Sequence, residues 1–88
     1  MKSIFKYQIS YSAQIEIQLP MDSKVISAGL DPQGDLCIWA LVDPETAMTS
    51  RVFMVVGTGW SMEDEIDNWE FIGTVRQGPY MWHVFEVI

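Results

Sequence analysis

The feature that most constrains the fold is an apolar run enclosed by two turn signals. Six successive apolar residues, Cys-Ile-Trp-Ala-Leu-Val, occupy positions 37–42. An Asp-Pro-Gln-Gly sequence at 31–34 precedes the run, and Asp43-Pro44 ends it. A strand of this composition has no polar face, so we expect it to be covered on both sides. The run therefore predicts the central strand of a small all-β domain.

Other segments are typical of short strands because they alternate in polarity or are rich in β-branched and aromatic residues. They lie at 4–10, 13–19, 24–30, 51–58, 71–76 and 80–88. In the segment 24–30 we expect Val25, Ile26 and Leu30 to be buried, and Gly29 to mark a bulge. The pattern predicts an all-β, mainly antiparallel fold of about seven short strands, either a small sandwich or a partly open barrel.

The connections follow from turn chemistry. Pro32 presets φ and Gly34 tolerates positive φ, so the turn at 31–34 predicts a hairpin between the third strand and the central one. We also expect a hairpin turn at Tyr11-Ser12 and a polar loop over 43–50. Ser61, followed by acidic residues, is typical of a helix start, and at most one short helix fits near 61–68.

Size and charge narrow the class of protein. With 88 residues, we expect one small β domain over 1–88. A chain of this length buries only about 60–65% of its unfolded surface, which favours a homodimer or a higher oligomer. The net charge of −7 argues against nucleic acid as a partner, because such a protein needs a basic patch. An acidic surface fits a partner protein with a basic surface.

Cysteine content and hydropathy indicate the compartment. Cys37 is the single cysteine, so neither an internal disulfide nor a cysteine zinc cluster can form. This composition suits a reducing cytoplasm. Lys6 and Gln8 interrupt the first apolar segment, and no run reaches membrane-spanning length. We expect a cytoplasmic protein with no metal, no cofactor and no membrane association.

Candidate catalytic residues are few. His83 is the only histidine, and it lies between apolar neighbours on a predicted strand. We interpret it as a packed histidine that satisfies backbone groups, because no Ser or Cys nucleophile motif accompanies it. Asp43 and Glu86 are the alternative partners that would orient it as a base. Cys37 lacks the electropositive setting of a reactive thiolate. We therefore predict no catalytic residues and no enzyme activity.

Two stretches are candidate binding sites. The first is a dense run of acids around a tryptophan, which forms either a solvated loop or a contact surface for a basic partner. It comprises Glu63, Asp64, Glu65, Asp67, Trp69 and Glu70. The second is Gly57, Thr58, Gly59 and Trp60. It forms either a tight exit turn or a loop that binds an anionic ligand, with Trp60 and Trp69 as walls for a planar group such as a nucleobase.

Several motifs together resemble a family of short bacteriophage proteins of unknown function, over nearly the whole chain. The most specific are Cys37-Ile38-Trp39-Ala40-Leu41-Val42-Asp43 and Trp82-His83-Val84-Phe85-Glu86. The others are Lys6-Tyr7, Pro20 followed by Lys24-Val25-Ile26-Ser27, Arg51-Val52-Phe53, Gly57-Thr58-Gly59 and Ile72-Gly73-Thr74-Val75. The resemblance implies a phage or prophage product in a bacterial cytoplasm, and it supplies no catalytic residues.

Size, acidity and this resemblance lead to two expectations about function. The first is a small phage accessory protein that binds and inhibits a host bacterial protein, for example as an anti-defence factor. The alternative is a protein that binds and sequesters a small nucleotide signal, using the Gly57 to Trp60 stretch.

Overall fold

The computed structural model describes residues 1–11, 14–62 and 68–88, and these residues form seven strands. In chain order the strands are β1 (Ser3–Gln8), β2 (Ile15–Pro20), β3 (Lys24–Leu30), β4 (Leu36–Val42), β5 (Met48–Gly57), β6 (Trp69–Gln77) and β7 (Tyr80–Val87). The all-β prediction is confirmed. The helix predicted near 61–68 falls mainly on residues 63–67, which lie outside the described residues.

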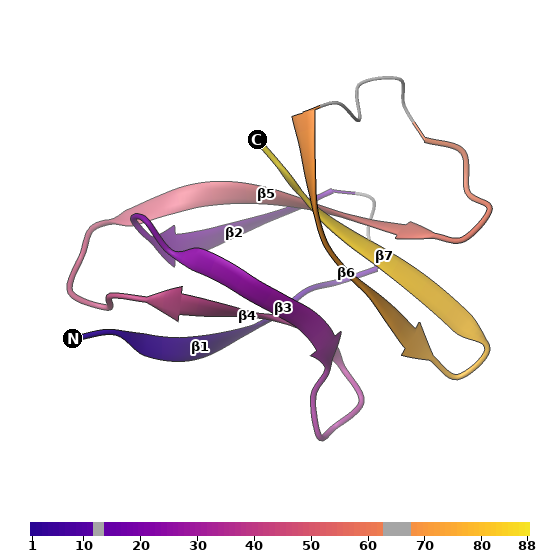
Figure 1. The fold of residues 1–88 in the computed structure, drawn as a ribbon, viewed down its shortest axis with the longest axis horizontal. Helices are drawn as coiled ribbons and strands as arrows, with labels where there is room; N and C mark the ends of the chain where they lie inside the picture. Colours follow the sequence, from indigo (N-terminus) through magenta and orange to yellow (C-terminus); the bar gives the residue numbers. More distant parts are fainter. Residues whose placement is uncertain (12–13, 63–67) are drawn as a thin grey trace.

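The strands form two antiparallel sheets that stack as a sandwich (Figure 1). The three-stranded sheet has the order β1-β4-β3, and the four-stranded sheet has the order β2-β5-β7-β6. Of the two predicted architectures, the sandwich is therefore the observed one, and the sheets do not close into a barrel. The apolar run at 37–42 lies in β4, the central strand of its sheet, as predicted.

The core lies between the two sheets. Alternate residues of β4, from Leu36 to Val42, face inward and are at most 1% exposed. The buried core residues are Ile9, Leu19, Leu36, Ile38, Phe53, Val55, Val75 and Val84. The opposite face of β4 carries Trp39 and Leu41, which are half-buried. β4 is therefore fully covered on one side and partly covered on the other.

The predicted hairpin at Tyr11-Ser12 is wrong. β1 pairs with β4 and β2 pairs with β5, so the first two strands lie in different sheets. Ile9, just after β1, is buried in the core between the sheets. Alternating polarity shows which face of a strand is buried, but it does not show which strand lies alongside.

The polar loop predicted over 43–50 is shorter in the structure. β5 begins at Met48, and its first residues pair with the end of β2, for example Leu19 with Thr49. Thr49 pairs with Leu19 and is half-buried, and exposed Ser50 pairs with Gln18 on the polar outer face of the edge strand β2. Its last residue, Pro20, has no N–H group, and an edge strand tolerates this loss.

The bulge predicted at Gly29 is also wrong. The irregularity in β3 falls between Val25 and Ser27, so Ile26 is the extra residue. A bulge changes the alternation of side chains. Ile26 and Leu30 are exposed, and of the three residues predicted to be buried Val25 alone is half-buried. Gly29 instead faces the Trp39 ring, and a Cβ atom there would lie 3.5 Å from Trp39 Cζ3, which is an ordinary contact.

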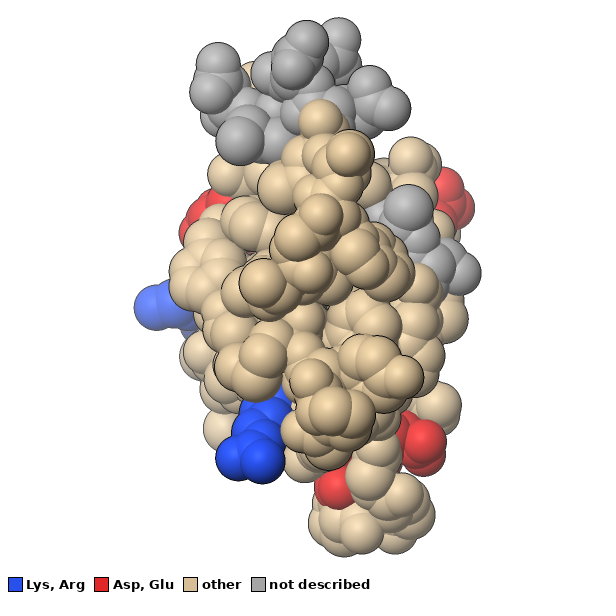
Figure 2. Space-filling view, turned by 90° about the vertical axis from the view of Figure 1, so that its right-hand side faces the viewer, with Lys and Arg blue, Asp and Glu red and all other residues tan. Residues whose placement is uncertain are grey.

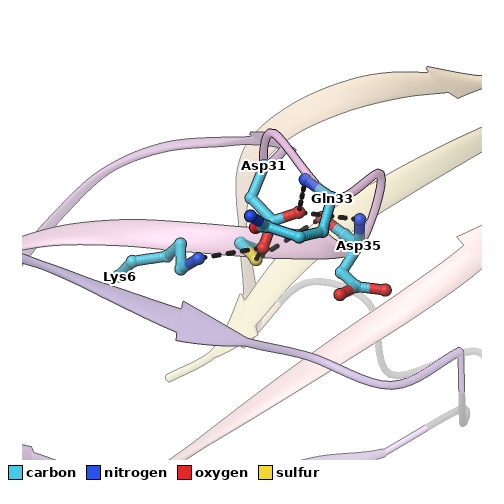
Figure 3. A network of polar contacts seen from close by, with 5 residues as sticks. Lys6, Asp31, Gln33 and Asp35 are labelled. Atoms are coloured by element: carbon cyan, nitrogen blue, oxygen red, sulfur yellow. Dashed lines mark hydrogen bonds and ion pairs between the residues drawn. The ribbon is translucent and has the colours of Figure 1, made fainter.

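The turn predicted at 31–34 is confirmed and joins β3 to β4 (Figure 3). Gly34 has a φ of 83° and donates its N–H to the Asp31 carbonyl. Asp31 Oδ1 accepts hydrogen bonds from the backbone N–H groups of Gln33 and Asp35 at 3.0 and 2.9 Å. Asp31 Oδ2 accepts one from Lys6 Nζ at 2.9 Å. This hydrogen bond from Lys6 is the main cause that lowers the pKa of Asp31 to about 2.

Candidate functional site

Four aromatic side chains gather at one end of the sandwich. Trp82 on β7 is the centre of this aromatic cluster, which also contains Tyr11, Trp60 and Tyr80. The ring centroids lie 5.0 Å from Trp82 for Tyr11, 5.5 Å for Trp60 and 5.8 Å for Tyr80. The Trp60 contact is edge-to-face, and the Tyr80 contact is stacked. Both are favourable geometries for aromatic pairs, so the cluster is held together by ring contacts as well as by burial.

The glycine loop is what brings Trp60 into the cluster. Trp60 donates its N–H to the Gly57 carbonyl at 3.1 Å, and Gly59 has a φ of 85°, so residues 57–60 form a β-turn. The turn folds the Trp60 ring back over Gly57, which lies opposite Trp82 in the β5–β7 register. A Cβ atom at Gly57 would approach Trp60 Cε2 to 2.7 Å, which is too close. Gly57 is therefore required for the observed position of Trp60.

Gln77 connects the cluster to the rest of the fold. Its Oε1 accepts a hydrogen bond from Trp82 Nε1 at 3.1 Å. Its Nε2 donates to the Tyr11 hydroxyl and to the Gly34 carbonyl, the latter at 3.1 Å. The side chain thus joins three segments that are distant in the sequence. Because the polar atom of Trp82 is satisfied internally, the ring presents only apolar surface to a ligand.

The cluster lines a cleft of about 360 Å³. The residues around the cleft are Gly57, Thr58, Trp60, Pro79, Tyr80, Met81 and Trp82. We call this surface, together with Tyr11, the aromatic end. Trp60 is 51% exposed and Tyr80 is 60% exposed. Figure 2 shows the side of the molecule on which the β6–β7 hairpin and the end of β5 lie in Figure 1. Its described surface consists mostly of uncharged side chains, and the charged ones lie at the margins.

His83 lies on the opposite face of β7 from Trp82. Its Nε2 is 2.7 Å from Thr58 Oγ1, and its Nδ1 is 3.0 Å from Thr74 Oγ1. The predicted partners were backbone groups, with Asp43 or Glu86 as alternatives, and all of these assignments are wrong. Two hydroxyl groups hold the ring across β6, β7 and the turn after β5. This arrangement leaves no carboxylate on the imidazole and fits a role in holding these elements together.

The residues of the predicted acidic partner site are mostly beyond the described part of the chain. Glu63, Asp64, Glu65 and Asp67 lie outside the described residues. Trp69 and Glu70 are consecutive in β6, so their side chains point to opposite faces of the sheet. Trp69 packs 5.6 Å from the Phe85 ring on the outer face. Glu70 lines a second cleft on the inner side.

This second cleft is polar, and we call it the ionic cleft. It measures about 380 Å³ and is lined in part by Ser23, Lys24, Arg51, Glu70 and Glu86. Arg51 Nε and one terminal nitrogen contact the two Glu86 carboxylate oxygens at 2.5 and 2.7 Å. The other terminal nitrogen of Arg51 donates to the Ser23 carbonyl. The hydrogen bond to Glu86 raises the pKa of Arg51, so the guanidinium stays protonated.

Tyr11, Gln77 and Tyr80 were not predicted as site residues. Tyr80 follows the Gly78-Pro79 turn, and an aromatic residue beside a turn is a weak signal of exposure. The contacts of Tyr11 and Gln77 depend on strand pairing, which no local pattern encodes. Among the residues that the structure describes, no group of three or more His, Cys, Asp or Glu side chains is placed to hold a metal ion. The same residues contain no helix long and apolar enough to cross a membrane.

The fold and the site define a class: a small antiparallel β-sandwich with an uncharged aromatic end. The chain belongs to the family described as Domain of unknown function (DUF7352), whose model matches residues 1–88. The expectation of a family of unknown function is confirmed. No curated protein and no solved structure matches the chain.

Proposed function

We propose that this protein is a small phage accessory protein that binds a host bacterial protein through its aromatic end and inhibits it. The host cytoplasm is the place of action, and a component of host defence fits as the target. The observation that supports the proposal most directly is the exposure of Trp60 and Tyr80 on a rigid support. Large aromatic side chains supply most of the binding energy at protein interfaces, particularly when a scaffold holds them in place.

The charge pattern supports a protein partner rather than a nucleic acid. The chain has a net charge of −7, yet the aromatic end is largely uncharged (Figure 2). Interfaces commonly combine an apolar centre with a charged rim that directs association. In the sequence the acidic run begins at Glu63, three residues after Trp60. A partner with an apolar pocket beside basic residues complements both features.

Affinity capture from host lysate tests the proposal when it compares matched variants. Wild-type protein and Phe71→Ala are expected to retain the same host protein, and Trp60→Ala is expected to lose it. Phe71 is a suitable control because it is 56% exposed on β6 but lies outside the aromatic cleft. Thermal melting of each variant shows whether the fold is retained. Equal capture by all three proteins would contradict the proposal.

A second candidate function is the binding of a nucleotide signal, and the cleft itself favours it. A volume of about 360 Å³ lies in the range of small-molecule sites, and the Trp60, Tyr80 and Trp82 rings can stack on a base. Native mass spectrometry of protein purified from phage-infected cells distinguishes the two functions. A retained mass of nucleotide size that Trp60→Ala loses supports this candidate. A retained host protein supports the first.

A further inference from the structure

The four edge strands of the two sheets differ in how they are protected from pairing with another chain. Unpaired edges recruit other strands unless a proline, a bulge or a free charge prevents it. β2 ends at Pro20, β3 has a bulge at Ile26, and β6 has a bulge at Ile72. β1 pairs with β4 in an unbroken register from Ser3 to Gln8. The one charged residue within β1, Lys6, is bound to Asp31 Oδ2 at 2.9 Å.

The hydrogen-bonding groups on the free side of β1 can be identified from its pairing. Ile9 donates its N–H to the Leu36 carbonyl at 2.9 Å, in continuation of the β1–β4 register. Hydrogen-bonded and non-hydrogen-bonded pairs alternate along an antiparallel ladder. The odd-numbered residues of β1 therefore direct their backbone groups toward β4. The even-numbered residues, Ile4, Lys6 and Gln8, direct theirs toward the free edge.

Both faces of this edge also expose apolar side chains. Ile4 is 57% exposed on the outer face of the sheet, and Phe5 is 40% exposed on the inner face. Phe5 lies opposite Ala40 and belongs to the core side, so its exposure means that the sandwich is open at β1. A strand added here would cover both side chains and satisfy the free backbone groups.

We propose that β1 pairs antiparallel with β1 of a second copy of this chain, in a register centred on Phe5. The two three-stranded sheets then become one continuous sheet across a two-fold axis, with both four-stranded sheets on the same side. Phe5 lies opposite Phe5 of the second copy in a non-hydrogen-bonded pair. Ile4 lies opposite Lys6 of the second copy in a hydrogen-bonded pair, as the direction of their backbone groups requires.

Charge favours this edge over β2 and β6, and it selects the register. Two molecules with a net charge of −7 repel each other, and self-pairing of β2 or β6 would add the carboxylates of Glu16 or Glu70 to the contact. Residues 2–8 contain two lysines and no acidic residue. In a register centred on Lys6, this lysine lies opposite Lys6 of the second copy. In a register centred on Ile4, Lys6 lies opposite Lys2 of the second copy. Directly opposed like charges destabilise a strand pair, and the register centred on Phe5 avoids them.

Sedimentation of matched charge variants tests this interface. Wild-type protein is expected to dimerise with rising micromolar concentration. Ile4→Lys places a lysine against Lys6 twice in each dimer, so the dissociation constant should rise by about tenfold. Ile4→Glu removes the same apolar surface but opposes Lys6 with an acid, so the dimer should be as strong as the wild type or stronger. A monomeric wild type, or equal effects of the two variants, would overturn the proposal.

Disulfide trapping tests the register independently. Residues in a non-hydrogen-bonded antiparallel pair have Cα atoms about 4.5 Å apart, which is within the range of a disulfide. Phe5→Cys should therefore form a covalent dimer under mild oxidation, whereas Ile4→Cys should not, because it faces Lys6. Cys37 is buried and does not interfere. Equal trapping at both positions would overturn the register. Partner capture through Trp60 is a separate measurement, because the aromatic end is not part of this edge.

Discussion

The ionic cleft and the aromatic cleft have similar volumes and opposite chemistry. The ionic cleft measures about 380 Å³, and its charges are largely satisfied by one another, since Glu86 is 7% exposed and is paired with Arg51. The aromatic cleft measures about 360 Å³. Trp82 Nε1 is bonded to Gln77 inside the fold, whereas the Trp60 and Tyr80 rings are 51% and 60% exposed. A cleft favours a binding partner when its side chains are not already paired with other groups of the same protein. The ionic cleft stabilises the sandwich, and the aromatic cleft is available for binding.

The largest effect is expected from breaking the ion pair of the ionic cleft. Arg51→Met leaves the buried Glu86 carboxylate without a partner, which should lower the free energy of unfolding by about 3 kcal/mol. Urea denaturation measures this change. The double variant Arg51→Met with Glu86→Leu removes both charges and should regain much of the loss. If the double variant is no more stable than Arg51→Met alone, the unpaired carboxylate is not the cause.

A smaller effect, confined to the other cleft, is expected from Gly57→Ala. The new Cβ atom lies in the space of the Trp60 ring, 2.7 Å from Cε2, so the ring must move away from Trp82. Overpacking of this kind costs about 1–3 kcal/mol. Near-ultraviolet circular dichroism should show the loss of the Trp60–Trp82 contact, and partner capture should fall.

Gly73→Ala is the matched control for this substitution. A Cβ atom at Gly73 would lie 3.7 Å from the Ala28 Cβ atom, which is an ordinary contact. Its near-ultraviolet spectrum and its partner capture should equal those of the wild type. A Gly57→Ala variant that keeps the wild-type spectrum would show that the glycine is not needed to seat Trp60.

Asp31 is a second charged group that is paired within the fold, and the pH dependence of stability tests its contribution. The pKa of Asp31 is lowered to about 2, chiefly by Lys6. A carboxyl group with a lowered pKa stabilises the fold above its unfolded value of about 4, and this contribution is lost as the pH falls toward 2. Asp31→Asn should show a smaller loss of stability than the wild type between about pH 4 and pH 2. Identical pH profiles of the two proteins, measured by thermal melting, would contradict this assignment.

Local chemistry explains which parts of the fold could be predicted from the sequence. The turn at 31–34 was predictable because proline and glycine restrict adjacent dihedral angles directly. The position of β4 was predictable because a short all-apolar run between two turn signals favours a covered strand. The partners of β1 and β2 were not predictable, because strand pairing joins residues far apart in the sequence. The alternation of polarity along a strand does not identify its neighbour. The bulge at Ile26 was missed because its residues carry no glycine signal.

The candidate site was predictable only in part, for the same reason. The stretch from Gly57 to Trp60 was predicted as a tight turn or a ligand-binding loop; the turn is confirmed, and ligand binding stays a prediction. Its counterpart Tyr80 and the supporting Gln77 come from a distant hairpin, and only the β5–β7 register brings them together. The Arg51–Glu86 pair likewise spans 35 positions in the sequence. Chemistry that depends on register cannot be derived from local patterns.

The smallest effect on stability, and the sharpest on binding, is expected from Tyr80→Ala. Tyr80 is 60% exposed and contacts Trp82 by stacking, so its removal should change the free energy of unfolding by about 0.5 kcal/mol or less. Partner capture should nevertheless fall at least as clearly as with Gly57→Ala, because Tyr80 forms one wall of the aromatic cleft. Phe71→Ala removes an aromatic ring of similar exposure and should leave capture unchanged. If Tyr80→Ala and Phe71→Ala give the same stability and the same partner capture, the exposed ring of Tyr80 does not contribute to binding. The two clefts would then differ only in their contribution to stability.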